Sequence, residues 1–137
     1  MEGEITAEAE RTEALQLLRI YQSQIEALSN QSALVSLSYD ETKHAMETIS
    51  SYKDVKEAEE ILIPVGSDMF IRGYSKISEK ALLRVGADVF VDKSYDDILK
   101  ELEERKNRLE DFRKKVESDL NSMENEVSKL IDRVQRP

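Results

Sequence analysis

Residues 60–93 read EILIPVGSDMFIRGYSKISEKALLRVGADVFVDK, and this stretch differs in character from the sequence on either side of it. It contains three of the four glycines and the only internal proline. Four short apolar runs are separated by the turn signals Gly66-Ser67-Asp68, Ser78-Glu79-Lys80 and Gly86-Ala87. Short β-rich runs bounded by such turns predict two β-hairpins. Pro64 fits a strand edge or a strand end, where no ladder donor is needed.

Hairpins of this size are marginally stable alone, and their apolar faces and open edges favour aggregation. We therefore expect the hairpins in residues 60–93 to pair with those of other subunits in a larger sheet or barrel.

The segment before the hairpins, from about Thr6 to about Glu59, has no internal glycine or proline and predicts one long helix. One series of residues within it alternates steps of four and three, which is the a/d spacing of a coiled-coil seam. Its members are Ala14, Leu18, Tyr21, Ile25, Leu28, Ser32, Val35, Tyr39, Thr42, Met46 and Ile49. A single helix of this length needs a second one to cover its apolar stripe.

The second helix is predicted over residues 94–136, beginning at a capping motif formed by Ser94 and Asp97. Its seam is expected to contain Arg105 and Phe112, with a stutter between Phe112 and Leu120 where two steps of four follow each other. The members of this series are Ile98, Leu102, Arg105, Leu109, Phe112, Val116, Leu120, Met123, Val127, Leu130 and Val134.

The fold class expected is α+β and mainly helical: a single subunit, residues 1–137, with a long antiparallel two-helix coiled coil joined by two short β-hairpins. The 36% of charged residues fits long solvated helices better than a compact globular core. Because the hairpins return the chain on itself, both termini are expected at the end of the coiled coil far from them.

Composition excludes several classes of function. The net charge of −9 argues against nucleic acids and anionic membranes as partners. The chain has no cysteine for disulfides or thiolate chemistry, which fits a reducing cytoplasm, and it has neither an 18-residue apolar run nor a basic, apolar signal peptide. The single histidine, His44, is read as a solvated helix residue. We find no catalytic constellation and expect neither enzyme activity, nor a metal, nor a cofactor.

Apolar residues that the seam does not require gather near both ends of the chain. Antiparallel pairing brings the two groups to the same end, where apolar surface marks a binding site. The residues assigned to this end are these off-seam residues together with the terminal seam residues of the second helix: Ile5, Leu15, Leu17, Ile20, Val127, Leu130, Ile131 and Val134. The alternative is that they widen the helix–helix interface or pack on a neighbouring subunit, because Leu34 and Leu37 are off the seam in mid-helix as well.

The order of a long helix, two hairpins and a returning helix resembles the prefoldin family. The most specific part is Ile61-Leu62-Ile63-Pro64-Val65-Gly66, followed by Phe70-Ile71-Arg72-Gly73 and by the run from Val85 to Lys93. Two hairpins, where other members have one, resemble the alpha class of subunit, and the compact length resembles an archaeal member.

The resemblance implies a hexamer of two alpha and four beta subunits with a double β-barrel body and coiled-coil arms. Such a complex captures unfolded proteins at the ends of the arms and passes them to a group II chaperonin without using nucleotide. The resemblance also assigns an oligomer interface to Ile61, Ile63, Val65, Phe70, Ile71, Leu82, Val85, Val89, Phe90 and Val91.

Two other functions remain open at this point. One is a structural spacer, in which the hairpins oligomerise and the helices hold other proteins apart. The other is an RNA-binding helical hairpin, which is disfavoured because lysine and arginine are interleaved with glutamate, as in residues 101–106.

Overall fold

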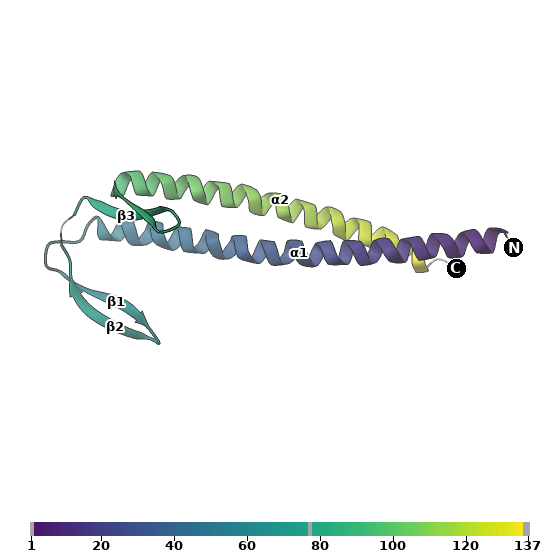
Figure 1. Cartoon of the computed structure of the whole chain (residues 1–137), viewed down its shortest axis with the longest axis horizontal. Helices are drawn as coiled ribbons and strands as arrows, with labels where there is room; N and C mark the ends of the chain where they lie inside the picture. The colour runs from purple at the N-terminus through teal and green to yellow at the C-terminus, as the bar shows by residue number, and fades with distance from the viewer. Residues whose placement is uncertain (1, 77, 136–137) are drawn as a thin grey trace. The chain divides into compact units, whose positions relative to one another are not determined.

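The structure is a computed structural model that describes residues 2–76 and 78–135, without the side chains of Glu2 and Ile5 (Figure 1). Along the chain, a long helix is followed by two antiparallel strand pairs and a second long helix, which confirms the predicted fold class. The elements are α1 (Glu2–Tyr52), β1 (Glu60–Gly66), β2 (Met69–Tyr74), β3 (Lys80–Gly86), β4 (Val89–Ser94) and α2 (Tyr95–Gln135). Within the described residues, neither helix combines the length and the apolar character that crossing a membrane requires.

The chain divides into two compact units, and each contains part of both helices. The first comprises Met1–Tyr39 with Arg108–Pro137, and the second comprises Asp40–Asn107 with both hairpins.

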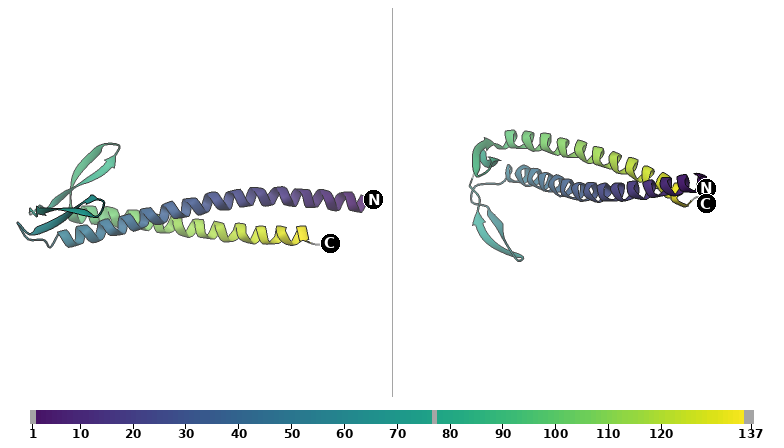
Figure 2. Two further views of the ribbon diagram at one scale, coloured as in Figure 1. Left: turned by 90° about the horizontal axis from the view of Figure 1, so that it is seen from below. Right: turned by 45° about the vertical axis from the view of Figure 1, so that its right-hand side comes forward.

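In the first unit, α1 and α2 lie side by side and run antiparallel (Figure 2). A core cluster joins Ala14 and Leu18, near the start of α1, to Leu130, near the end of α2. Val35 and Val116 are buried as well. Every described member of the α1 series from Ala14 to Ile49 is buried or half-buried, so the predicted seam of the first helix is confirmed.

The seam of α2 differs from its prediction in the middle of the helix. Arg105 and Phe112 are exposed, whereas their neighbours Lys106 and Arg113 are half-buried. With these two residues the two consecutive steps of four fall between Ile98 and Lys106, and the steps alternate from there through Val116, so the predicted position of the stutter between Phe112 and Leu120 is wrong. The physical reason is that long basic side chains bury their stems along a seam and keep the charged group near water.

In the second unit, α1 ends at Tyr52, seven residues before the predicted end near Glu59. The loop that follows is bonded to Ser75, the residue after β2. The amide of Ala58 donates to the Ser75 carbonyl at 2.8 Å, and the Ser75 amide donates to the Glu59 carbonyl at 2.8 Å. Ala58 has a φ of 58°. These backbone hydrogen bonds to Ser75 take the place of the hydrogen bonds that would continue helix α1. No glycine or proline near Tyr52 marks this helix end in the sequence.

The two hairpins repeat each other at an offset of 20 residues. In the first, Pro64 is opposite Phe70 and the register shifts before Gly66 pairs with Met69. In the second, Arg84 is opposite Phe90 and the register shifts before Gly86 pairs with Val89. The turns differ, since Gly66, Ser67 and Asp68 all have positive φ, whereas the second turn has a positive φ at Asp88.

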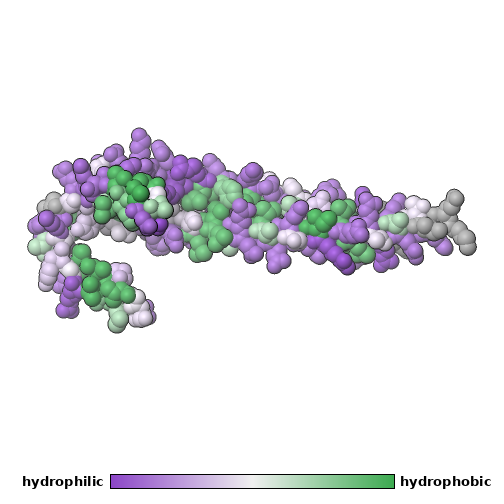
Figure 3. Space-filling view, in the orientation of Figure 1, coloured by the Kyte–Doolittle hydropathy of each residue, from purple (hydrophilic) through white to green (hydrophobic). Residues whose placement is uncertain are grey.

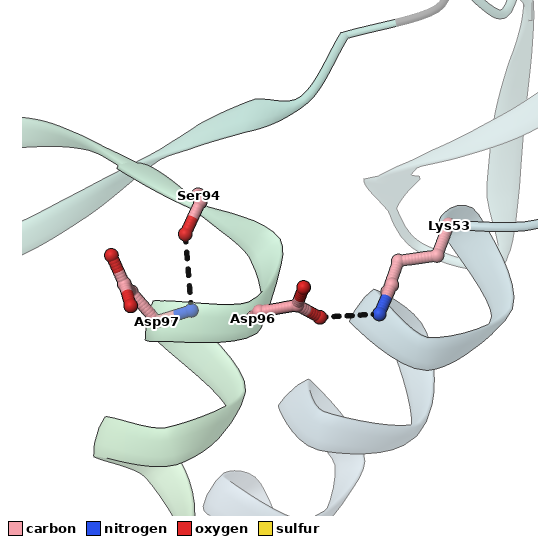
Figure 4. Close-up of polar contacts among 4 residues, drawn as sticks. All are labelled: Lys53, Ser94, Asp96 and Asp97. Atoms are coloured by element: carbon pink, nitrogen blue, oxygen red, sulfur yellow. Dashed lines mark hydrogen bonds and ion pairs between the residues drawn. The ribbon is translucent and has the colours of Figure 1, made fainter.

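The start of α2 is capped as predicted (Figure 4). Ser94 Oγ accepts a hydrogen bond of 3.2 Å from the Asp97 amide, which satisfies one of the free donors of the first turn. Next to it, Asp96 forms an ion pair with Lys53, the first residue after α1. The rings of Tyr52 and Tyr95 meet edge to face with centroids 6.1 Å apart.

Candidate interaction surfaces

The hairpins carry apolar side chains on both faces. Directly opposed residues share a face, and successive residues alternate between faces. On the first hairpin, Ile63 and Ile71 therefore occupy one face, and Leu62 and Phe70 occupy the other. All four are exposed, Phe70 at 58%. A two-stranded ribbon that leaves both faces bare has no core of its own.

The second hairpin repeats this arrangement. Leu83 and Val91 share one face, and Leu82 and Phe90 lie on the other. Leu82, Phe90 and Val91 are exposed, and Leu83 is half-buried. Hydrophobic surface on the hairpins is also visible in the space-filling view (Figure 3).

All ten predicted interface residues lie on these strands, and all are exposed except Ile61, which is half-buried. The sequence reasoning missed three further large exposed side chains: Leu62, Met69 and Tyr74. Strict alternation of faces along β1 and β2 would have assigned Leu62 and Tyr74 to the interface, because they lie on the same face as Phe70.

Gly73 shapes one face of the first hairpin. A Cβ atom at this position would lie 2.9 Å from Ile63 Cδ1, so the absence of a side chain lets Ile63 extend across β2. Glycine within a strand often marks such a close approach.

The residues predicted to bind unfolded protein at the end of the coiled coil separate into two groups. Leu15, Leu17, Ile20 and Ile131 are exposed, and binding there stays a prediction. Ile5 has a side chain outside the described part of the structure.

The other three predicted end residues belong to the contact between the helices. Leu130 is only 5% exposed, and Val127 and Val134 are partly buried against the same cluster. Leu130 is therefore buried between the helices, as its place in the seam predicts, and its contact with a client stays a prediction. Leu130 is a seam residue that packs with Leu18, and α2 remains helical to Gln135 without fraying there.

Two of the most exposed aliphatic side chains of the helices lie away from the helix ends. Leu34 is 65% exposed and Leu37 is 60% exposed. Both were recognised as off the seam in the sequence, but helical periodicity alone left open whether α2 covers them.

Charged groups on the helices are mostly exposed, and several of them form ion pairs within one turn. Examples are the i,i+3 ion pairs of Glu103 with Lys106 and of Glu126 with Lys129. His44 is exposed beside Glu47, as expected for a solvated helix residue. In the part of the chain that the structure describes, histidine, aspartate and glutamate form no group that could hold a metal ion.

Comparison with known proteins agrees with this architecture. The family model described as prefoldin subunit matches residues 21–137. A putative prefoldin subunit alpha of Aquifex aeolicus is 26% identical over 131 residues, covering 96% of this chain and 88% of the relative. The prefoldin subunit alpha of Pyrococcus horikoshii is 26% identical over 118 residues, covering 85% and 80%.

Two solved structures are similar. A filamentous PFD from Methanocaldococcus jannaschii, solved by cryo-EM, superimposes with a TM-score of 0.72 at 25% identity, covering 88% of this chain and 98% of that one. The prefoldin beta subunit from Thermococcus strain KS-1 shares the fold, with a TM-score of 0.62 at 20% identity and 93% coverage of both chains.

The chain belongs to the prefoldin family. The two hairpins and the alpha-subunit relatives, mostly archaeal, place it in the alpha class.

Proposed function

We propose that the chain is a subunit of an ATP-independent chaperone that assembles through its hairpins and holds unfolded proteins with its helices. The observation that carries the assembly is the pair of hairpins exposed on both faces. Phe70 and Phe90 occupy equivalent positions in the two hairpins, and both are more than half exposed. Burying a large apolar side chain contributes about 1.5–3 kcal/mol, so covering both faces of both hairpins would strongly stabilise an oligomer.

The proposed partners are prefoldin beta-type subunits in a hetero-hexamer of two alpha and four beta chains. A filament is the second assembly to be distinguished, because one of the solved relatives is filamentous. The absence of cysteine fits a reducing cytoplasm as the place of action.

The clients in this proposal are unfolded proteins, and a group II chaperonin receives them. No single apolar contact on the helices is strong, so several arms of one complex would have to act together. Without client binding, the same chain would be a structural spacer. The experiment therefore measures assembly and capture separately.

Assembly is tested by the solution mass of the chain alone and mixed with a beta-type subunit. The double variant Phe70→Ser/Phe90→Ser should remain helical but lose the mixed complex, because one exposed aromatic is removed from each hairpin. Glu104→Ser, at an exposed position of α2 outside the hairpins, is the control and should assemble normally. A double variant that assembles as the natural chain does would refute the hairpin interface.

Capture is tested by adding the mixed complex to a protein unfolded in guanidinium and diluted into buffer. A chaperone should suppress light scattering by the aggregating protein without nucleotide. A complex of the expected mass that leaves the scattering unchanged would instead identify a spacer.

A further inference from the structure

Arg113 is a charged residue at a seam position of α2. Its neighbours along the seam are apolar, with Leu109 half-buried before it and Val116 buried after it. A charged group in an apolar seam is less favourable than an apolar residue of similar size, because the charge loses water. In coiled coils, a polar residue at one seam position can specify the register of the helices at a cost in stability. The contacts of Arg113 indicate such a role.

Arg113 has one partner on its own helix and one on α1. Glu110, one turn earlier in α2, accepts a hydrogen bond of 2.8 Å from Arg113 Nη2, and Glu110 Oε2 is shielded from solvent. Tyr39 of α1 presents its ring to the guanidinium at 5.1 Å. If the helices slid past each other, the contact with Glu110 would move with α2, whereas the contact with Tyr39 would be lost. Of these two contacts, the one with Tyr39 therefore depends on the register.

The apolar residues of the seam do not distinguish one register from the next. Leu18 and Ile25 are seven positions apart in α1, as are Leu28 and Val35. Sliding one helix by a heptad, about 10 Å, would therefore place apolar side chains opposite apolar side chains again. The pattern of apolar residues alone leaves more than one register open.

The connection between the helices constrains the register weakly. It comprises residues 53–94, so its length does not fix the register as a turn of a few residues would. At its ends, the ion pair of Lys53 with Asp96 is largely exposed, and exposed ion pairs contribute little. The edge-to-face contact of Tyr52 with Tyr95 is a single ring pair. A contact within the first unit is therefore needed to select one register there.

A shift by one heptad would take Arg113 away from an aromatic ring. The residues seven positions before and after Tyr39 are Ser32 and Met46, and neither side chain offers a π-face. The other tyrosine of the α1 seam, Tyr21, is 18 positions from Tyr39, which is not a whole number of heptads. A half-buried guanidinium would therefore lose its partner on α1 in either shifted register.

We propose that the contact of Arg113 with Tyr39 selects the register in which α2 packs against α1. The arginine makes the seam less stable than leucine would, and it lowers the stability of the shifted registers more. The register decides how far the start of α1 extends past Gln135, the last residue of α2. It thereby decides which apolar residues near that end remain exposed.

The register is read by trapping disulfides in the full chain, which has no natural cysteine. Leu18→Cys/Leu130→Cys reports the observed register, because both residues belong to one buried cluster. Ile25→Cys/Leu130→Cys and Arg11→Cys/Leu130→Cys report shifts of one heptad in the two directions. After mild oxidation, gel electrophoresis without reductant measures the fraction of chains with an internal disulfide. Thermal unfolding is followed in parallel by circular dichroism on the proteins without cysteine.

Three sets of substitutions are combined with each cysteine pair. Arg113→Leu/Glu110→Gln removes the charge from the seam, and the glutamine avoids a partly buried carboxylate without its partner. Tyr39→Leu removes the ring and leaves the arginine in place. Lys106→Leu is the matched control, because Lys106 is the half-buried basic residue one heptad earlier but forms its ion pair with Glu103 of the same helix.

We expect the natural chain and Lys106→Leu to form the Leu18–Leu130 disulfide, with both shifted disulfides at background. Arg113→Leu/Glu110→Gln should form at least about tenfold more of a shifted disulfide, because an apolar seam is more stable but less specific. Its unfolding temperature should stay equal or rise. A purely stabilising arginine would give the opposite result, a lower unfolding temperature with an unchanged register.

Two results would overturn the proposal. One is an Arg113→Leu/Glu110→Gln protein that forms the Leu18–Leu130 disulfide with both shifted disulfides still at background. The other is equal shifting in Lys106→Leu, which would show that any added apolar surface in the seam loosens the register. If the Arg113→Leu/Glu110→Gln protein unfolds, Tyr39→Leu decides the question: a shifted disulfide supports the proposal, and background levels of both refute it.

Discussion

The guanidinium of Arg113 in α2 lies over the ring of Tyr39 in α1, with 5.1 Å between the guanidinium carbon and the ring centroid. Nη2 of the same arginine is 2.8 Å from each carboxylate oxygen of Glu110. Arg113 thus occupies the seam position expected for Phe112 and joins the two helices in the middle of the apolar seam. A basic side chain with a negative partner and an aromatic face nearby tolerates partial burial.

Replacing Arg113 with alanine should lower the free energy of unfolding by about 1–2 kcal/mol, because it removes the contact with Tyr39 and leaves Glu110 without this partner. Thermal unfolding followed by circular dichroism measures the change. Arg108→Ala, at an exposed position of the same helix, should change stability by less than about 0.5 kcal/mol. Equal effects of the two substitutions would show that the Arg113–Tyr39 contact contributes nothing.

Replacing Ser94 with alanine should lower the free energy of unfolding by about 1 kcal/mol, because the Asp97 amide loses its capping acceptor. Ser94→Asp restores an acceptor and should recover most of the loss. Chemical denaturation of the three proteins checks this order. An aspartate variant no more stable than the alanine variant would mean that Ser94 acts through something other than its cap.

Glycine is required at the end of β1 but not at the equivalent end of β3. Gly66 has a φ of 103°, a conformation that side-chain-bearing residues rarely adopt, whereas Gly86 lies outside that region and has open space around it. Gly66→Ala should therefore destabilise the first hairpin by about 1–2 kcal/mol and weaken assembly with beta-type subunits. Gly86→Ala is the matched control and should assemble normally. Analytical ultracentrifugation of both mixtures compares them, and identical assembly would refute the requirement.

Replacing Ser75 with alanine should loosen the junction between α1 and the first hairpin. Ser75 is buried, its hydroxyl donates to the Lys56 carbonyl, and it accepts a hydrogen bond of 2.9 Å from the Glu59 amide. Losing both bonds should cost about 1–3 kcal/mol. Hydrogen exchange should accelerate at the Ala58 and Glu59 amides. Ser78→Ala, at an exposed position, should leave their exchange unchanged, and unchanged exchange in the Ser75 variant would contradict this role.

Much of the architecture was predictable because it depends on local patterns. The steps of four and three from Ala14 to Ile49 define one helical face, and burial of that face in the structure follows it closely. The clustering of Gly66, Gly73 and Gly86 predicts hairpins, since turns and close strand contacts need residues without side chains. Ser94 marks the start of α2 by its capping chemistry.

The candidate surfaces were only partly predictable. The exposed apolar residues of the hairpins follow from strand alternation and from the small size of the hairpins. At the helix ends, however, Leu130 was expected both in the seam and on an open surface, and the structure buries it in one cluster with Leu18. Periodicity identifies which residues share a face, but not whether another element covers that face.

The amino-acid sequence by itself determined the two long helices, their antiparallel return through two hairpins and the seam of α1, because these depend on short-range spacing and turn chemistry. Only the tertiary structure decided that α1 ends at Tyr52, that Arg113 and not Phe112 lies in the seam, and that Leu34 and Leu37 remain uncovered. Each of these depends on a partner far away in the sequence: Ser75 beside the loop, Tyr39 beneath the guanidinium, and the position of α2 on the other side of α1.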